Sequence, residues 1–527
     1  MKLYRAAQMR EADARAAAAG VPGPQLMDAA GRAVARVLRQ RFPLARRALL
    51  LCGKGNNGGD GYVAAAALTE AGVEARVLEL AAEPSTDDAR GARAALVAAG
   101  GAPALLTPAV LDDALAWADV VIDALLGCGL DRPLSGALAD IVQKVNDAGV
   151  SVVAVDVPTG VDADVAVPPG PHVQAAVTVE MAGPKVAGAF HTARAAYGER
   201  VVADIGTPAH VLDEASDTLL LDDAALRSAL PARAVDAHKY AAGTVTIVAG
   251  SERYLGAAEL ACRGAWRGGA GMVTLVAPAR HPSAWPETIL EPHDLTAASA
   301  HGARTAALPH LWPPTGLEPR RAGACVIGPG LDRAGLAALD AVLAWAPGPV
   351  VLDATALDPS VWTEARRTSL ALRGDAVLTP HAGEAARLLD VASSAVRRDP
   401  LGSAATLSER FGAVVVLKGA TTVVRAPDGA EAVSLRGHPG MASGGTGDAL
   451  AGLLGALLAA PGGQSRANRE QTRVAPDEPS VTPFQRACLA VWLHGVAGER
   501  AAARLGNGLV ASDLIDEIPG AMHSLGW

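Results

Sequence analysis

The segment of this chain best suited to chemistry is the glycine loop Gly444-Gly445-Thr446-Gly447-Asp448, which opens an apolar helical stretch. Glycine lets backbone N–H groups approach a phosphate closely, and a helix starting there adds its free first-turn donors and positive dipole end. A carboxylate inside such a loop repels a bound phosphate, so we expect Asp448 to take the proton from a hydroxyl that attacks phosphorus. The simpler interpretation is a glycine turn followed by a helix-capping aspartate.

A second glycine-rich run, at 53–61, follows an apolar stretch and precedes a helical one. A strand, a glycine loop and a helix in this order form an anion pocket, although the run matches neither a Walker loop nor a dinucleotide fingerprint. The side-chain oxygens of Asn56 and Asn57 suit a hard cation, and strand-end carboxylates at Asp123 and Asp156 could complete its shell. The alternative is that each aspartate only caps the next helix or turn.

Composition indicates which architecture must position these loops. The 527 residues exceed one typical core, so we expect two large domains. Half of the residues are hydrophobic but only 3% are aromatic, which favours alanine-rich helices on aliphatic strands, an α/β architecture. The net charge of −9 has mixed signs and no basic footprint, which argues against nucleic acid or an anionic membrane as partner.

Cysteine usage and the chain start indicate the compartment. The five cysteines are scattered and include no C-x-x-C pair, which disfavours a disulfide scaffold and a zinc site. The N-terminus lacks the apolar core of a signal peptide, and no long charge-free apolar segment follows. We therefore expect a soluble, cytoplasmic protein.

The first domain is expected at 1–213 and the second at 220–527, with a polar exit linker at 207–217. Two helices over 11–40 precede strands and helices that alternate as in a parallel sheet wrapped by helices. In the first domain the expected strands are 48–52, 73–80, 119–126, 151–157, 173–179 and 199–205, and the expected helices are 62–71, 86–99 and 135–148. In the second domain we expect strands at 244–249, 272–277, 324–328, 349–353, 376–379 and 413–417, a hairpin at 421–435 and a flexible loop at 461–482.

Several second-domain residues follow expected strands, where α/β proteins bind ligands. Lys418 could hold a nucleotide phosphate or ribose, or be an ordinary strand-end lysine. A structural role is favoured for His381 alone, and Glu384 could cap the next helix or position magnesium.

The first domain resembles the NAD(P)H-hydrate epimerase family. The resemblance rests on the run 55–61, on Asp123, on the segment 156–160 and on an early Leu-Met-Asp-Ala-Ala-Gly motif at 26–31. It implies a Rossmann-like, three-layer domain that interconverts R and S hydrates of NADH and NADPH. It also implies a potassium ion held by Asn57, Asp123 and Thr159, where the family usually has serine in place of Thr159. Substrate contacts would fall on Asn56, Gly58, Gly59, Asp60, Asp156 and the loop 127–133 with Gly127 and Gly129, and Asp156 would handle the proton. Lys185 could face this site, although a solvated lysine is the preferred interpretation.

The second domain resembles the ADP-dependent NAD(P)H-hydrate dehydratases, a ribokinase-like family. The resemblance combines the loop 444–448 with the motifs His238-Lys239, 256–260, 328–331, 378–384 and 417–421. It implies dehydration of the S hydrate with ADP and magnesium, releasing AMP and phosphate. Ala257, Gly330, His381 and Asp448 would touch the hydrate. The nucleotide would contact Lys418, Gly419, Ala420, Thr421, Thr422 and Gly447, with the Gly445, Thr446 and Gly447 amides stabilising the transferred phosphoryl charge.

Four positions depart from the pattern of this family. Thr355 follows Asp353-Ala354 where the family continues with Asp-Gly, which puts a substrate or metal role of that segment in doubt. Asp332 replaces a glycine, Tyr240 replaces a glycine after His-Lys, and His438 replaces an asparagine.

The sequence thus predicts a bifunctional, self-associating repair enzyme acting on hydrated NADH or NADPH. One alternative is a ribokinase-like kinase of a small alcohol with an N-terminal ligand-binding module, because the Gly-Gly-Thr-Gly-Asp loop serves such kinases too. Another alternative makes the first domain a catalytically idle binding module. The preference between ADP and ATP and between the NADH and NADPH hydrates stays open.

Overall fold

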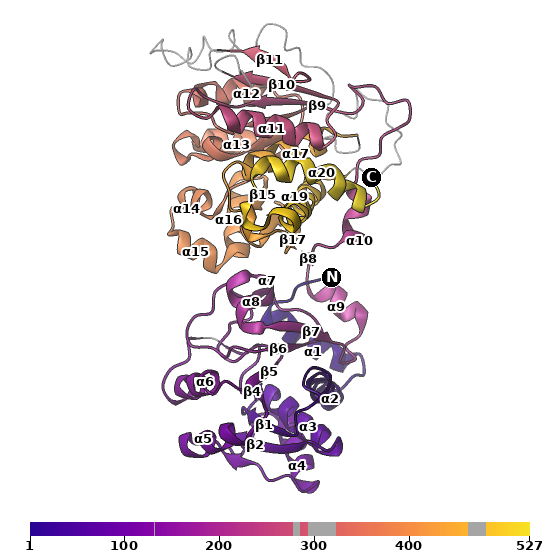
Figure 1. Ribbon diagram of the computed structural model, residues 1–527, viewed down its shortest axis with the longest axis vertical. Helices are drawn as coiled ribbons and strands as arrows, with labels where there is room; N and C mark the ends of the chain where they lie inside the picture. Colours follow the sequence, from indigo (N-terminus) through magenta and orange to yellow (C-terminus); the bar gives the residue numbers. More distant parts are fainter. Residues whose placement is uncertain (131, 278–284, 294–312, 314–322, 462–480) are drawn as a thin grey trace. The chain divides into compact units, whose positions relative to one another are not determined.

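The computed structural model describes residues 1–527 except 131, 278–284, 294–312, 314–322 and 462–480 (Figure 1). The chain forms two compact units, Met1–Leu219 and Leu220–Trp527. Most of the flexible loop expected at 461–482 lies outside the described residues. None of the helices in the described ranges is both long and apolar enough to cross a membrane.

Unit one contains a seven-stranded sheet in which every strand pairs in parallel with its neighbours. Its strand order is β3-β2-β1-β4-β5-β6-β7. The strands are β1 (Arg47–Cys52), β2 (Glu74–Glu79), β3 (Ala104–Leu105), β4 (Val120–Ala124), β5 (Ser151–Val155), β6 (Val177–Met181) and β7 (Glu199–Ala203). Five of the six expected strands are confirmed, and the sixth, expected at 173–179, overlaps β6 only from Val177 onward. The unpredicted β3 is too short to show a hydrophobic pattern.

Helices cover both faces of this sheet. They are α1 (Ala6–Ala18), α2 (Gly23–Arg41), α3 (Asn56–Glu70), α4 (Asp87–Ala98), α5 (Pro108–Trp117), α6 (Ala137–Asp147), α7 (Val186–Ala189), α8 (His191–Tyr197) and α9 (Ala209–Ala215). Successive side chains of a strand point to opposite faces, so Leu50 joins the core of α2 and α3, while Leu49 joins that of α5 and α6. The expected three-layer α/β domain is confirmed.

The segment 207–217 is not the plain linker expected from its polar residues. It contains α9, which packs on α1 through an ion pair between Glu214 and Arg15. The Tyr4 hydroxyl also donates a hydrogen bond to the Leu212 carbonyl at 3.2 Å. The boundary between the units therefore falls later, after Leu219.

Unit two is built on a ten-stranded sheet of order β11-β10-β9-β12-β13-β14-β15-β16-β17-β8. Its strands are β8 (Thr218–Leu220), β9 (Thr244–Val248), β10 (Met272–Ala277), β11 (Ile289–Pro292), β12 (Gly323–Ile327), β13 (Val350–Leu352), β14 (Ala376–Leu378), β15 (Val414–Leu417), β16 (Thr422–Arg425) and β17 (Glu431–Ser434). Pairing is parallel from β11 to β15 and antiparallel from β15 to β17, which confirms the expected hairpin.

The helices of unit two are α10 (Asp223–Leu226), α11 (Leu255–Arg267), α12 (Leu339–Trp345), α13 (Glu364–Arg373), α14 (Ala382–Leu389), α15 (Ser393–Arg398), α16 (Pro400–Phe411), α17 (Thr446–Ala459), α19 (Pro483–Leu505) and α20 (Ala511–Ser524). Short 3-10 turns lie at Arg227–Ala229, Gly335–Ala338, Ala354–Leu357, Pro359–Val361, Pro439–Met441 and Gly506–Gly508. Helices α11 and α17 touch backbone to backbone, because a Cβ on Gly452 would lie 1.9 Å from the Ala261 carbonyl oxygen. This close packing fixes the helix that carries the loop 444–448.

Candidate active sites

In unit one the expected site residues gather at the carboxyl ends of β1, β4 and β5, neighbouring strands of the sheet. The loop after β1 passes so close to its neighbours that side chains are excluded. A Cβ on Gly53 would lie 1.8 Å from the Leu125 carbonyl oxygen, and one on Gly58 would lie 1.9 Å from the Gly53 oxygen. A Cβ on Gly59 would lie 2.6 Å from Cε of Met27 in α2. Gly58 and Gly59 are therefore positions where a larger residue would disturb the packing of this loop.

Two of the three residues expected to bind a cation are in direct contact. The Thr159 hydroxyl and backbone N–H both donate to the fully buried Asp123 carboxylate, at 2.6 and 2.8 Å. Burial raises the pKa of Asp123 to about 6, even though the hydrogen bonds from Thr159 act in the opposite direction. The structure thus brings the oxygens of Asp123 and Thr159 together at the carboxyl ends of β4 and β5.

The third expected ligand, Asn57, reaches the loop that follows β4. Its Oδ1 lies 2.8 Å from the position of a Cβ on Gly127, and its Nδ2 is buried with no hydrogen-bond partner. The O and N of an amide are interchangeable in shape, so either atom can face the space beside this loop. The described residues contain no cluster of three or more His, Cys, Asp and Glu suited to a metal ion. The oxygen atoms available as ligands are those of the Asn57 amide, the Thr159 hydroxyl and the Asp123 carboxylate. This set suits a hard cation.

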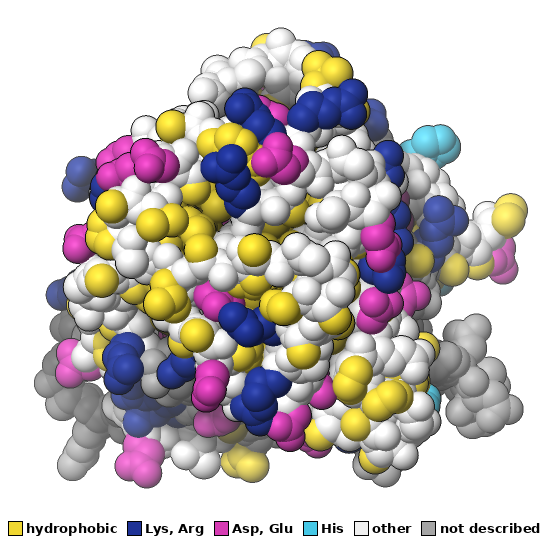
Figure 2. Space-filling view, turned by 90° about the horizontal axis from the view of Figure 1, so that it is seen from below, with side chains coloured by type: hydrophobic (Ala, Val, Ile, Leu, Met, Phe, Trp, Pro, Cys, Tyr) yellow, Lys and Arg dark blue, Asp and Glu magenta, His cyan; other side chains and the backbone are white. Residues whose placement is uncertain are grey.

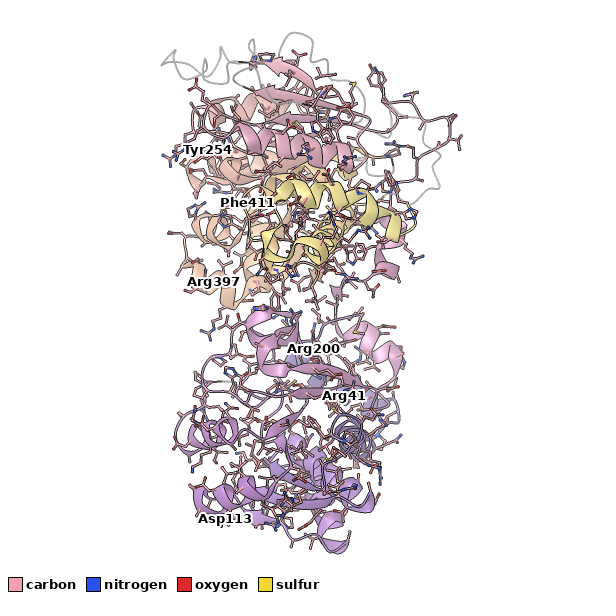
Figure 3. All side chains as sticks on the ribbon, in the orientation of Figure 1. Arg41, Asp113, Arg200, Tyr254, Arg397 and Phe411 are labelled. Carbon is pink, nitrogen blue, oxygen red and sulfur yellow. The ribbon has the colours of Figure 1, made fainter. Side chains whose placement is uncertain are left out.

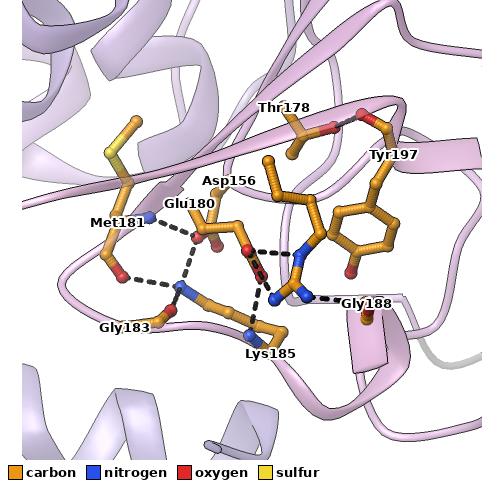
Figure 4. A network of polar contacts seen from close by, with 9 residues as sticks. Asp156, Thr178, Glu180, Met181, Gly183, Lys185, Gly188 and Tyr197 are labelled. Carbon is orange, nitrogen blue, oxygen red and sulfur yellow. Dashed lines mark hydrogen bonds and ion pairs between the residues drawn. The ribbon is translucent and has the colours of Figure 1, made fainter. Parts of the chain in front are cut away.

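Asp156 sits just after β5 with a φ of 65°, which is unusual for a residue other than glycine. Its carboxylate accepts hydrogen bonds from the Cys128 thiol at 3.0 Å and the Met181 N–H at 3.1 Å. It also pairs with the Lys185 ammonium at 2.5 Å (Figure 4). A strained backbone and several converging partners are typical of a functional carboxylate.

The interpretation of Lys185 as a solvated lysine is wrong, because its side chain is only 1% exposed. Its Nζ donates to the carbonyls of Met181 and Gly183 at 2.7 and 3.1 Å (Figure 4). Burial alone would lower the pKa of Lys185, but the charges of Asp156 and Glu180 outweigh it and the pKa is raised. The ammonium therefore stays charged beside Asp156.

A second carboxyl group, Asp60 of α3, faces the same charges. Burial raises the pKa of Asp60 well above its usual value, and the negative charge of Asp156 adds to the rise. A carboxyl that favours its neutral form beside a carboxylate paired with lysine is a common acid–base arrangement. The neighbouring Asn56 is exposed and accepts a hydrogen bond from Thr86 at 2.6 Å, and Gly129 is exposed as well.

In unit two, residues that follow three neighbouring strands meet around one buried carboxylate. Asp353, after β13, is 2% exposed and accepts hydrogen bonds from Lys418 Nζ after β15 and the Thr379 hydroxyl after β14, each at 2.7 Å. The sequence left a role for this segment in doubt because Thr355 departs from the family. Thr355 instead donates to the Leu331 carbonyl at 2.7 Å, and Asp353 joins the candidate site, although the sequence did not single it out.

Asp448 lies in the first turn of α17, and the helix begins directly after Gly445, which adopts a left-handed φ of 93°. Burial, followed by the negative charges of Asp353 and Glu384, raises the pKa of Asp448 to about 7 against the opposing charge of Lys418. Lys418 borders the same loop, since a Cβ on Gly447 would lie 3.3 Å from its Nζ. The arrangement places a proton acceptor that titrates near neutral pH beside an ammonium group and a helix N-terminus.

His381 caps α14, as the sequence favoured. Its Nδ1 accepts a hydrogen bond from the Gly383 N–H at 2.9 Å, and the Glu384 carboxylate accepts one from the His381 N–H at 2.9 Å. Glu384 therefore completes a capping box with His381 through its Oε2, and burial raises the pKa of Glu384. The His381 side chain stays 54% exposed, which leaves its ring accessible to a ligand.

The remaining expected contacts fall into two places. Gly330, with a φ of 64°, packs on Ala257, whose Cβ lies 2.8 Å from the position of a Cβ on Gly330. A Cβ on Gly330 would also lie 2.6 Å from the carbonyl oxygen of Tyr254, which precedes α11. Tyr254 is labelled in Figure 3. Gly419, Ala420, Thr421 and Thr422 form the turn from Lys418 into β16, where the Thr422 hydroxyl donates to the Gly419 carbonyl at 3.3 Å.

The other departures from the family pattern have local structural roles. Asp332 accepts a hydrogen bond from the Gly335 N–H at 2.8 Å, and His438 accepts one from the Gly440 N–H at 3.1 Å. Tyr240 packs edge-on against His238, with ring centroids 6.2 Å apart. Another contact that the sequence did not single out is the hydrogen bond of 2.9 Å from His494 to the Thr446 carbonyl.

Each unit matches a different protein family. Residues 245–520 match the family described as NAD(P)H-hydrate dehydratase, and residues 23–187 match the family described as YjeF-related protein N-terminus. These ranges contain the two candidate sites described above.

Similar proteins align over both units. A bifunctional NAD(P)H-hydrate repair enzyme of Moorella thermoacetica is 36% identical over 545 residues, covering 100% of this chain and 97% of its own length. A protein of the same name from Coxiella burnetii is 33% identical over 524 residues, covering 98% of each chain. An ADP/ATP-dependent NAD(P)H-hydrate dehydratase of Bacillus subtilis, crystallised with ATP and Mg²⁺, is 27% identical and covers 58% of this chain and 99% of its own, with a TM-score of 0.46.

Proposed function

This chain belongs to the family of bifunctional NAD(P)H-hydrate repair enzymes, and we propose that the two sites carry the two reactions of that family. Unit one interconverts the R and S hydrates of NADH and NADPH around Asp156. Unit two returns the S hydrate to NAD(P)H around Asp448, using ADP. Family membership favours this function over a small-alcohol kinase and over an idle first domain.

The dehydration follows from the position of Asp448. Its carboxylate takes the proton from the C6 hydroxyl of the hydrate while the hydroxyl oxygen attacks the β-phosphorus of ADP, and the bond from that phosphorus to AMP breaks. The amides of Gly445, Thr446 and Gly447 stabilise the charge on the transferred group, and Lys418 holds the nucleotide. The ring nitrogen then expels phosphate from C6, and loss of a C5 proton restores the dihydronicotinamide. The observation that carries this proposal is a carboxyl group with a pKa of about 7 inside a helix N-terminal glycine loop.

Magnesium would neutralise charge on the phosphates when bound. The buried Glu384 carboxylate is the residue that would hold it, together with the phosphate oxygens themselves. His381 would contact the hydrate with its exposed ring edge, and Ala257 and Gly330 would line the same pocket.

The epimerisation requires a group that both gives and takes a proton at C6. Loss of the hydroxyl as water consumes one proton, and addition of water to the opposite ring face returns it, with electrons supplied by the ring nitrogen. Asp156 is the residue proposed to handle this proton, since Lys185 holds its carboxylate in place. Asn56, Gly58, Gly59, Asp60, Gly127 and Gly129 would surround the substrate.

A potassium ion fits the oxygens of Asn57, Asp123 and Thr159, because Asn57 has a buried amide atom without a partner and Asp123 is a buried carboxylate. When bound, the ion would offset the Asp123 charge and join the loops after β1, β4 and β5. We expect replacement of K⁺ by Na⁺ to slow conversion of R to S hydrate while dehydration of pure S hydrate in unit two is unchanged.

Two substitutions sharpen this test. Thr159→Ser keeps the hydroxyl, so it should keep potassium-dependent epimerisation, whereas the nearly isosteric Thr159→Val should lose it. Equal epimerase rates in K⁺ and Na⁺ for the wild type, or a fully active Thr159→Val, would refute the potassium site.

The phosphoryl donor is tested in unit two with pure S hydrate, Mg²⁺ and either ADP or ATP. We expect reduced-nicotinamide absorbance to appear with ADP in step with AMP. Absorbance that appears only with ATP, in step with ADP, would overturn the proposed donor while leaving the role of Asp448 intact.

The cellular compartment is proposed from the cysteines, and the oligomeric state from the family resemblance. All five cysteines are free thiols in the structure, which supports a reducing, cytosolic compartment. Self-association rests on the family resemblance alone. On the face drawn in Figure 2, acidic and basic side chains intermingle, in keeping with small-molecule substrates rather than nucleic acid.

A further inference from the structure

One face of α19 supports the segment that leads into the anion-binding loop. The residues concerned are His494, Gly495, Gly498 and Glu499, whose spacing places them together on a helix surface. Each of them contacts the chain between Arg436 and Thr446. None of these residues has a role in the functions proposed above.

The end of this segment nearest the active site is held by His494. Its Nε2 donates a hydrogen bond of 2.9 Å to the carbonyl of Thr446, the first residue of α17. The Thr446 hydroxyl lies 3.1 Å from the carbonyl oxygens of both Met441 and Ser443, so it donates within the loop. The Thr446 peptide is thereby fixed from two sides.

The far end is held by Glu499 and by two glycines. Glu499 accepts a hydrogen bond from the Gly437 N–H at 2.9 Å and pairs with Arg436 at 3.2 Å. A Cβ on Gly495 would lie 2.7 Å from the Arg436 carbonyl carbon, and one on Gly498 would lie 2.1 Å from Met441 Sδ. The two glycines therefore leave space on the surface of α19 against which the chain from Arg436 to Met441 packs.

The His494 side chain does not change its protonation state near neutral pH. Burial lowers the pKa of His494 to about 4, the nearby charge of Lys418 acts in the same direction, and the hydrogen bond to Thr446 only partly opposes them. The imidazole is neutral above pH 5 and carries its proton on Nε2. It serves as a fixed donor rather than as an acid or base.

We propose that α19 is the positioning element of the dehydratase site, and that His494 is its principal positioning residue. By fixing the Thr446 carbonyl, His494 orients the Gly445, Thr446 and Gly447 amides toward the transferred phosphoryl group. This inference rests on the proposed binding of the nucleotide at the loop 444–448. Misplacing such donors by about 1 Å lowers a rate on the order of a hundredfold.

The test compares His494→Phe, which keeps a ring but removes the donor, with His494→Gln, which keeps an N–H donor. Cys488→Ala is the matched control, because Cys488 is also buried on α19. Cys488 is not one of the α19 residues named above that contact the chain between Arg436 and Thr446. Steady-state dehydration of pure S hydrate is measured with Mg²⁺ and ADP. Epimerisation by unit one of the same chain reports the amount of chain present, and chemical denaturation of unit two reports whether unit two is folded.

We expect His494→Phe to lower kcat on the order of 10- to 100-fold and to raise the KM for ADP, with the KM for hydrate and the epimerase rate unchanged. His494→Gln should recover most of the loss without shifting the pH profile, and Cys488→Ala should resemble the wild type. Gly495→Ala, which pushes the loop from its far end, should raise the KM for ADP in the same way.

Wild-type kcat and ADP KM in both His494→Phe and Gly495→Ala would overturn the inference. A fall in kcat with no change in ADP KM and no rescue by glutamine would also overturn it, because lost folded protein gives that pattern. Failure of the nucleotide proposal would look different. In that case the wild type itself would not depend on ADP.

Discussion

Asp448 titrates near neutral pH because of the residues that surround it. Burial makes the largest contribution to the rise in its pKa, the charge of Asp353 comes next, and Lys418 opposes both. A base with a pKa of about 7 is half ionised at neutral pH and still basic enough to accept a proton from a hydroxyl. The low-pH limb of kcat/KM for dehydration should therefore fall near pH 7, with activity lost as Asp448 becomes protonated.

Asp353→Asn tests this assignment. Asparagine can still accept hydrogen bonds from Lys418 and Thr379, but the negative charge that raises the pKa of Asp448 is gone. The limb should move to lower pH, so the ratio of kcat/KM at pH 6 to that at pH 8 should rise. Asp399→Asn, at the exposed cap of α16, is the charge-matched control and should leave the limb in place. A limb that stays at the same pH in Asp353→Asn would contradict the assignment.

At the residue scale, sequence patterns predicted the groups that lie in glycine loops or at strand ends. Asp448, Asp123 and Asp156 were found in this way. The burial of Lys185, which the sequence named only as a residue that could face the site, and the contact of His494 were not predicted, because both come from tertiary packing. A lysine after Gly-Pro resembles a surface residue until its ammonium is seen in contact with a carboxylate. His494 lies in the middle of a helix with no sequence signal for the carbonyl that it binds.

At the scale of elements, two helices set the position of the dehydratase loop. Helix α11 packs against α17 through glycines that allow backbone contact, and α19 holds the segment before α17. The apolar runs of the sequence predicted the strands to within a few residues because buried parallel strands are nearly continuous runs of Val, Leu and Ile. They could not predict β11, whose four residues include Glu291 and Pro292.

Gly452→Ala tests the contact between α11 and α17. A Cβ at this position would lie 1.9 Å from the backbone oxygen of Ala261, so the helices must separate. We expect a loss of about 1–3 kcal/mol in the free energy of unfolding of unit two and a slower dehydratase. Gly256→Ala, also in a helix but with open space around its Cβ, should be neutral or slightly stabilising. Equal stability of the two variants in chemical denaturation would contradict this packing.

At the scale of the whole molecule, the chain combines two units with separate sheets, cores and sites. The reactions are complementary, because the dehydratase accepts the S hydrate and the epimerase supplies it from the R hydrate. Since the two sites share no residue, a substitution in one unit should leave the other activity intact. Sequence alone predicted this organisation through two unrelated motif sets, although it placed the end of the first domain a few residues before Leu219.

The most direct test of the central claim follows reduced-nicotinamide absorbance in a mixture of R and S hydrates with ADP, Mg²⁺ and K⁺. The wild type should convert both epimers completely, and Asp156→Asn should stop at the S fraction, apart from slow uncatalysed epimerisation. Asp448→Asn should recover almost none of the absorbance while still epimerising. A wild type that stops at the S fraction, or an Asp448→Asn variant with full turnover, would contradict the account.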